Sequence, residues 1–311
     1  MDGLLLVDKP AGPTSHDVVE RMRRILREPR IGHTGTLDPA ATGLLPLVVG
    51  RATRLARFLS ASDKSYEAAI RLGVTTATGD AGGESAGPPY VGPLPLRDAI
   101  DRALNAFRGT YPQRPPAFSA KRIAGQRSYK IARRARSSPD EGALPVQAAA
   151  VNVTAHTIDL VAYESDTLTL RLDVSAGFYV RSLAHDLGQH LGPGAHLVTL
   201  RRTRAGAFTV DDAIPLAIAE QQPERAVAAV VPMAGMLANW SSVVLSAEGV
   251  RRALNGRDLG PGDIQRTFGS GIFAARPSFA HVRLVDDAGE LIGIGEPANT
   301  PGLLHPSVVL R

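Results

Sequence analysis

The sequence predicts an α+β fold, in which a large mixed domain is followed by a small β domain. Segments that alternate apolar and polar residues, as strands do, are interspersed with segments whose apolar residues recur at helical spacing. A chain of 311 residues with an apolar fraction of 44% is long enough to form a buried core in one large and one small domain. From about Asn239 the pattern changes to a short helix, turns and a hairpin, so we predict domains at 1–238 and 239–311.

The N-terminal part of the chain predicts a buried strand followed by a helix. Residues 3–8 are mostly apolar and end at a turn rich in proline and glycine. Thr14 or Ser15 can cap a helix that continues to about Arg27, because apolar residues follow at the spacing of one helix face. The first residues lack a basic region and a small-residue cleavage site, so we expect a strand and not a signal peptide.

A short helix, a strand and a surface loop are predicted next. Residues 51–60 place apolar side chains on one side of a helix, and three arginines recur on the other side: Arg51, Arg54 and Arg57. Residues 66–72 alternate as a strand. Residues 75–95 are rich in glycine, proline and small side chains, which indicates a loop; its glycine cluster lacks the lysine and the helix of a phosphate-binding loop.

The middle of the chain carries a basic segment after a predicted helix at about 98–107. From Arg102 to Pro139 there are ten basic residues and no acidic one. Charge runs of mixed sign are usually solvated surface, whereas a run of one sign with interleaved aromatic residues favours a nucleic-acid surface. We therefore predict that the segment 111–150 is an insertion that contacts nucleic acid.

Further strands and a helix complete the large domain. Residues 151–153 and 168–174 alternate as strands, and a helix is predicted at about 178–191. Three side chains of this helix are of types that can bind metals: His185, Asp186 and His190. Because no further ligand stands at a recognisable spacing, we interpret them as surface or capping groups and expect no metal. The chain has no cysteine, which excludes disulfides, and no apolar run long enough to span a membrane.

One acidic side chain stands in a glycine-rich turn with arginines on both sides. Asp38 is the sole acidic residue between Pro29 and Ser62. Because Asp followed by Pro is a common helix start, one alternative is that Asp38 only caps a helix. Capping does not require the surrounding glycines, which permit close approach of the backbone to a ligand. A lone carboxylate among arginines fits a nucleophile at a site where a polyanion docks.

Five groups of motifs follow one another in the order of a known family. They are Val7-Asp8-Lys9-Pro10, Gly32 to Gly43, Asp63-Lys64-Ser65-Tyr66-Glu67, Gly177-Phe178-Tyr179-Val180-Arg181-Ser182, and Gly194-Ala195-His196-Leu197 with Leu200-Arg201-Arg202. With them the chain resembles the TruB family, the bacterial tRNA pseudouridine-55 synthases. The resemblance implies a mixed, largely antiparallel sheet flanked by helices, with a basic thumb insertion and a PUA-like C-terminal RNA-binding domain. It also implies a cytoplasmic monomer that modifies the T-loop of tRNA with no cofactor and no obligate protein partner.

The resemblance assigns the chemistry to three residues. Pseudouridine formation breaks the N1–C1′ bond, turns the uracil and joins C5 to C1′; it needs a nucleophile and a proton acceptor but no metal or redox cofactor. By resemblance Asp38 is the nucleophile, Arg181 pairs with it, and Tyr66 stacks on the uracil and accepts the C5 proton. Whether Asp38 attacks C6 of uracil or C1′ of ribose stays open.

The resemblance also implies a set of substrate-binding residues. His33 enters the T-loop stack beside the extruded uridine, while Lys9 either supports the first loop or contacts phosphate. Asp80 matches a family position whose role is open. The full set expected to bind substrate is Lys9, His33, Lys64, Lys121, Arg122, Lys130, Tyr179 and Leu200.

Three other functions remain alternatives. A guide-RNA-dependent relative would be longer and would lack the basic insertion. A tRNA-folding chaperone would not require Asp38, Tyr66 and Arg181 together. An acid–base hydrolase centred on Asp38 would need a second carboxylate.

Overall fold

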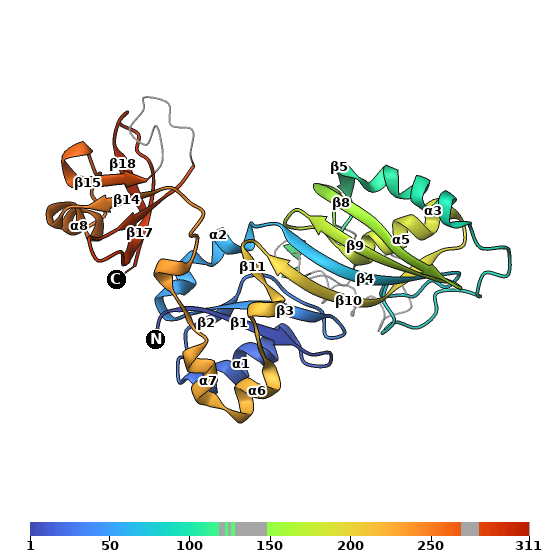
Figure 1. Ribbon diagram of the computed structural model, residues 1–311. Coiled ribbons are helices and arrows are strands. Elements are labelled where there is room, and N and C mark those ends of the chain that lie inside the picture. The colour runs from blue at the N-terminus through green and yellow to red at the C-terminus, as the bar shows by residue number, and fades with distance from the viewer. Residues whose placement is uncertain (118–121, 124–125, 128–147, 269–279, 311) are drawn as a thin grey trace.

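A computed structural model describes residues 1–117, 122–123, 126–127, 148–268 and 280–310 (Figure 1). Of the predicted RNA-binding insertion, Lys121 and Lys130 lie outside the described residues. Arg122 belongs to the short strand β6 (Arg122–Ile123), which pairs with β7 (Gln126–Arg127).

One mixed sheet forms the large part of the described molecule. It has 11 strands, eight of them in the order β12-β1-β3-β10-β4-β9-β8-β5. Apart from the parallel pairs β1–β12 and β3–β10, the pairs of the described sheet are antiparallel. The predicted mixed, largely antiparallel sheet is therefore confirmed. Its strands are β1 (Gly3–Lys9), β2 (Ile31–His33), β3 (Thr42–Val49), β4 (Lys64–Leu72), β5 (Gly109–Gln113), β8 (Val151–Glu164), β9 (Thr167–Val174), β10 (Ala195–Ala205), β11 (Phe208–Thr209), β12 (Ile214–Pro215) and β13 (Val231–Pro232).

Helices cover this sheet in two groups (Figure 1). One group, α3 (Arg97–Leu104) and α5 (Val180–Leu191), packs on strands β4, β8 and β9 around an apolar cluster that includes Ile70, Leu170 and Leu183. The other group packs on β1 and β3 and consists of α1 (Ser15–Leu26), α6 (Leu216–Gln221) and α7 (Pro223–Ala228). None of the described helices is long and apolar enough to cross a membrane.

The strands and helices that the sequence predicted for the large part of the molecule are present, whereas β3, β5 and β10 were not predicted. Thr14, and not Ser15, caps α1, because its hydroxyl accepts a hydrogen bond from the Asp17 amide while the Asp17 carboxylate accepts one from the Thr14 amide. Strand β4 alternates buried and exposed positions as the sequence predicts. Strand β8 is longer than predicted, since polar residues occupy its exposed face. The predicted helix at 51–60 begins as a 3₁₀ helix and becomes α2 (Ala56–Ser60).

A second sheet of five strands follows, in the order β15-β14-β16-β17-β18. Its elements are β14 (Ser242–Leu245), α8 (Ala247–Leu254), β15 (Ile264–Phe268), β16 (Val282–Val285), β17 (Leu291–Pro297) and β18 (Leu304–Val309). The predicted helix and hairpin are both present. One apolar cluster joins Leu55 and Met236 to Ile294 and Leu310, so the small sheet packs on the N-terminal part of the large one. That residues 239–311 form a PUA-like RNA-binding domain stays a prediction.

Candidate active site

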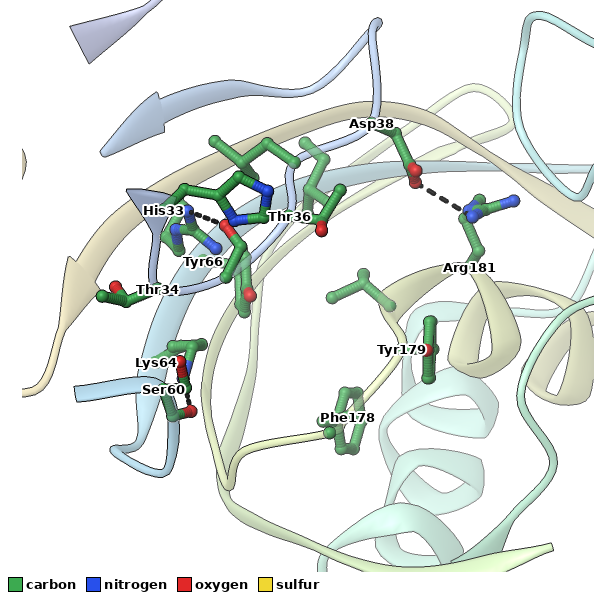
Figure 2. Close-up of a pocket in the computed structure, with 16 residues that line it drawn as sticks. His33, Thr34, Thr36, Asp38, Ser60, Lys64, Tyr66, Phe178, Tyr179 and Arg181 are labelled. Atoms are coloured by element: carbon green, nitrogen blue, oxygen red, sulfur yellow. Dashed lines mark hydrogen bonds and ion pairs between the residues drawn. The ribbon is translucent and has the colours of Figure 1, made fainter. Parts of the chain in front are cut away.

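A pocket of about 380 Å³ opens between the loop that joins β2 to β3 and the start of α5. Pockets of this size hold small ligands or a single extruded base. Among the residues that line it are seven that the sequence predicts for the site: His33, Asp38, Lys64, Tyr66, Tyr179, Arg181 and Leu200. Residues from distant parts of the chain therefore meet at one place (Figure 2).

Asp38 stands in a turn and not at a helix start. The Ala41 amide donates to the Asp38 carbonyl at 3.0 Å, and β3 begins at Thr42. The alternative that Asp38 only caps a helix is therefore wrong. Gly43 has a φ of +97°, and a Cβ there would lie 2.3 Å from the Arg202 carbonyl oxygen, so this glycine permits β3 to approach β10.

Arg181 meets Asp38 across the pocket. Its Nη2 lies 3.0 Å from Oδ2 of Asp38, and the arginine side chain is 6% exposed against 42% for the carboxylate (Figure 2). The guanidinium also donates to the Thr78 carbonyl at 3.1 Å, and its Nη1 lies 3.7 Å from Oδ2 of Asp80. Burial together with contacts on several sides fixes the direction of the guanidinium toward Asp38.

Asp80 supplies a second carboxylate to the site, a role that the sequence left open. Its Oδ1 accepts hydrogen bonds from the Thr78 hydroxyl at 2.6 Å and from the Gly82 amide at 3.1 Å. These bonds hold Asp80 in the loop that follows β4, beside Arg181. An acidic residue within a glycine-rich loop was the available signal, but its partner could be found only in three dimensions.

Tyr66 is both a core residue and a residue that lines the pocket. It is 7% exposed and belongs to the apolar cluster of β4, β9 and α5, and it also lines the pocket. On neighbouring strands it is paired with Arg202 and Leu172. Leu200 contacts the two apolar clusters of the large sheet from the pocket wall, so its packing and pocket-lining interpretations coincide in the same way.

Lys9 lies beneath the Asp38 turn and is fully buried. Its ammonium group donates to the carbonyls of Pro10 at 2.9 Å and Pro39 at 3.2 Å. The pKa of Lys9 is lowered to about 8, chiefly by burial; the charge of Asp38 opposes the shift and that of Arg202 adds to it. The expectation that Lys9 contacts phosphate is wrong, because the side chain has no exposed surface. The alternative expectation, that Lys9 supports the loop, agrees with its hydrogen bonds.

Two further buried cations lie near the pocket. The Lys64 ammonium donates to the carbonyls of Ser60, at 3.0 Å, and Ser62, and burial lowers its pKa to about 8, with Arg202 adding to the shift. Arg202, 1% exposed, donates from Nε to the Leu44 carbonyl and from Nη2 to the Gly35 carbonyl. That Arg202 supports the pocket was not predicted from the sequence. The available signal was its position two residues after Leu200, which places both side chains on the same face of a strand.

The arginines that follow Asp38 in the sequence point elsewhere. Arg51 pairs with Asp2 at 2.9 Å, and Arg54 donates to the Val309 carbonyl. Arg57 stacks over the Phe58 ring. The expectation that these arginines surround the carboxylate is wrong, because the 3₁₀ turn directs the first two toward the N-terminus and β18.

No group of three or more His, Asp or Glu side chains that could hold a metal ion is found among the residues that the structure describes. His190, one of the helix residues considered from the sequence, packs its ring against Phe107.

Comparisons with known proteins identify the family of this chain. A family model described as TruB family pseudouridylate synthase (N terminal domain) matches residues 23–180, and one described as tRNA pseudouridylate synthase B C-terminal domain matches residues 181–227. A tRNA pseudouridine synthase B of Solibacter usitatus is 41% identical over 312 residues, with 100% of each chain covered. One of Pseudomonas paraeruginosa is 37% identical over 316 residues, with 100% of this chain and 96% of that protein covered.

Solved structures share the fold. A chain in a structure titled as a Cbf5-Nop10-Gar1 complex aligns with a TM-score of 0.71 and 27% identity, covering 99% of this chain and 84% of that chain. A chain in an H/ACA RNP bound to a substrate RNA containing 2′-deoxyuridine aligns with a TM-score of 0.71 and 25% identity, covering 99% and 85%. The family models span most of the large sheet, and the curated relatives extend over the whole chain. The chain therefore belongs to the TruB family of pseudouridylate synthases.

Proposed function

We propose that this protein converts uridine at position 55, in the T-loop of tRNA, to pseudouridine, with Asp38 as the nucleophile. The ion pair between Asp38 and Arg181, 3.0 Å long and set in a pocket beside Tyr66, carries the proposal. The name tRNA pseudouridine synthase B, which the similar curated proteins share, supports tRNA as the substrate.

The pocket suits a base that has left its stack. Extruding a nucleotide costs a few kcal/mol, which stacking on aromatic and imidazole rings can offset. Tyr66 and Tyr179 offer rings inside the pocket, and His33 lies at its edge on the end of β2. In this proposal the uracil stacks on Tyr66, and His33 takes the place of the base within the T-loop.

The Asp38 carboxylate is both anchored and accessible. Arg181 contacts its Oδ2, while 42% of the side chain stays exposed. We assign bond formation to a carboxylate oxygen of Asp38, at C6 of uracil or at C1′ of ribose. The N1–C1′ bond breaks with its electrons on the uracil, the base turns, and C5 bonds to C1′. The bond to Asp38 breaks with its electrons returning to the carboxylate, either as C5 displaces Asp38 from C1′ or when Asp38 leaves C6. Tyr66 then takes the C5 proton, and N1 gains a proton, so that no atom is added and no electron is exchanged.

Other parts of the chain are assigned to RNA binding. The basic insertion 111–150, with Lys121, Arg122 and Lys130, clamps the tRNA, and the small sheet contributes a further RNA surface. We propose that the protein acts in the cytoplasm as a monomer without an obligate protein partner, because the basic insertion supplies RNA contacts of its own.

The Asp38→Asn variant tests the proposal. Asparagine keeps the shape of the side chain but is a poor nucleophile, so tRNA binding should persist while pseudouridine formation is abolished. Asp63→Asn is the matched control, because Asp63 is similarly exposed (47% against 42%) but pairs with His156 outside this pocket. Pseudouridine is mapped in a T-loop hairpin after incubation with each protein. Turnover by Asp38→Asn at near the wild-type rate would contradict the mechanism, and no product with the wild-type protein would contradict the substrate.

A further inference from the structure

A buried amide side chain outside the pocket contacts the backbone of a pocket residue. Gln113 ends strand β5 and is 1% exposed. Its Oε1 accepts a hydrogen bond from the Tyr179 amide at 2.8 Å, and its Nε2 donates to the Tyr179 carbonyl at 3.1 Å. The Nε2 also donates to the Tyr111 hydroxyl at 3.2 Å. Gln113 thus binds both backbone groups of one residue, as a neighbouring strand would.

Tyr179 is the residue at which α5 begins. It is the N-cap of the helix, its side chain makes no capping hydrogen bond, and its backbone is extended, with φ −111° and ψ 111°. The preceding turn requires Gly177 at a φ of +85°. Because a helix direction is set by the residues that enter its first turn, the Gln113 contacts fix how α5 starts.

Arg181 lies in that first turn, two residues after Tyr179. Ser182 follows Arg181 in the chain, and its hydroxyl donates to the Arg114 carbonyl at 2.7 Å. Gln113 and Arg114 are adjacent in the chain, so one short segment holds α5 on both sides of the arginine. Asp38 comes from a separate loop, and its 3.0 Å contact with Arg181 depends on where α5 starts.

We infer that Gln113 is a positioning residue of the isomerisation, which acts by holding Tyr179 so that Arg181 meets Asp38. The inference rests on the proposed role of Asp38. It assigns to Gln113 no contact with the substrate. Since a displacement of about 1 Å in a catalytic group can cost roughly 100-fold in rate, removal of the two hydrogen bonds should slow the reaction.

Gln113→Met tests the inference, because methionine has a similar length but neither donates nor accepts these hydrogen bonds. Single-turnover pseudouridine formation at saturating enzyme should fall by about 10- to 100-fold. The Kd for tRNA should stay within about twofold, since Gln113 is 1% exposed and, although it lies in the segment 111–150, is not among the side chains proposed to bind RNA. The matched control is Thr110→Val, which removes the 2.8 Å hydrogen bond between Thr110 and Thr154 in the same strand pair without touching α5. This control should keep the wild-type rate.

The outcomes separate the inference from the proposed function. An unchanged single-turnover rate in folded Gln113→Met, or an effect that falls entirely on the Kd, overturns the inference and leaves the role of Asp38 intact. If Asp38→Asn proves active, the proposed role of Asp38 fails, and a crystal structure of Gln113→Met decides the inference: a retained contact between Asp38 and Arg181 overturns it, and a displaced Arg181 supports it. If the methionine variant does not fold, Gln113→Asn replaces it, since its shorter amide cannot reach both groups of Tyr179.

Discussion

The two walls of the pocket differ in whether buried cations help to hold them. The wall that carries Asp38, residues 34–41, is supported by two buried cations and a buried hydroxyl: Lys9 donates to the Pro39 carbonyl, Arg202 donates to the Gly35 carbonyl, and the Ser15 hydroxyl donates to the Leu37 carbonyl and accepts from the Leu37 amide. The wall that carries Arg181, residues 177–182, is supported by uncharged groups, the Gln113 amide and the Ser182 hydroxyl.

Electrostatics accounts for this difference. The Asp38 wall bears a carboxylate and turns backbone carbonyls inward, so cationic donors beneath it are attracted to both. The Arg181 wall lies at the N-terminus of a 12-residue helix and already holds a guanidinium. The helix dipole is positive at that end, so a further buried cation would be repelled, whereas a neutral amide is not. We therefore expect the Asp38 wall to respond to pH and the Arg181 wall to respond to changes in shape.

After the loss of activity expected for Asp38→Asn, the largest effect is expected at Tyr66, which lines the pocket. Stacking on uracil needs only the ring, whereas removal of the C5 proton needs the phenol oxygen. Tyr66→Phe should therefore bind tRNA nearly as well as the wild type but form product about 10²- to 10⁴-fold more slowly, the usual contribution of a general base. Because N1–C1′ cleavage precedes deprotonation, single-turnover gels should show enzyme-linked RNA with this variant if Asp38 is bonded to C6, and free rearranged RNA if it had attacked C1′.

Tyr66→Leu is the companion variant. It should bind tRNA more weakly as well, because the aromatic face is gone. Full activity of Tyr66→Phe would assign the proton transfer to another group or to water and leave Tyr66 as a wall of the pocket.

A smaller effect is expected from pH, through Lys9. Its pKa of about 8 lies below the ordinary value of 10.5, so between these pH values the unfolded chain binds more protons than the folded one. The free energy of unfolding should therefore rise with pH across this window, by roughly 2 kcal/mol between pH 7.5 and 9.5 for this one group. Urea unfolding of the wild type and of Lys9→Met at both pH values measures the difference.

The comparison of the two walls supplies the control for this experiment. Gln113→Met should keep the pH dependence of the wild type, because it removes no titrating group, whereas Lys9→Met should lose part of the rise. An equal rise in the wild type and in Lys9→Met would mean that the ammonium group is not buried as the structure describes.

The sequence predicted what depends on local pattern and missed what depends on contacts across the fold. Strand β4 and helices α1 and α5 follow from apolar periodicity and capping residues. The pairing of Arg181 with Asp38 was implied only by resemblance, since the two residues are far apart in the chain. Burial of Lys9 could not be foreseen, because lysines are rarely buried and its partners are carbonyls of other loops.

Polar residues on strands that the sequence did not predict were the hardest to interpret. Arg202 and Gln113 are buried at strand positions where polar side chains usually face water. Their partners are backbone groups, which leave no signature in side-chain composition. Conversely, Arg51 and Arg54 lie near Asp38 in sequence, but nothing local indicates that they contact Asp2 and Val309 instead.

The smallest effect on the chemical step is expected from three cationic side chains of the basic insertion, a segment that also includes Gln113 and Arg114 beside α5. Replacing Lys121, Arg122 and Lys130 with Ala removes cationic side chains assigned to phosphate but alters neither wall of the pocket. The Kd for tRNA should rise at low salt, and the slope of log K against log salt should fall by about 0.7–0.9 for each phosphate that is no longer neutralised. The single-turnover rate at saturating enzyme should stay close to that of the wild type.

Arg24→Ala, which removes an exposed charge on α1, is the control and should leave the slope unchanged. An unchanged slope in the triple variant would make the insertion ordinary solvated surface, whereas a slower rate at saturation would mean that the insertion acts on the Arg181 wall as well as on RNA.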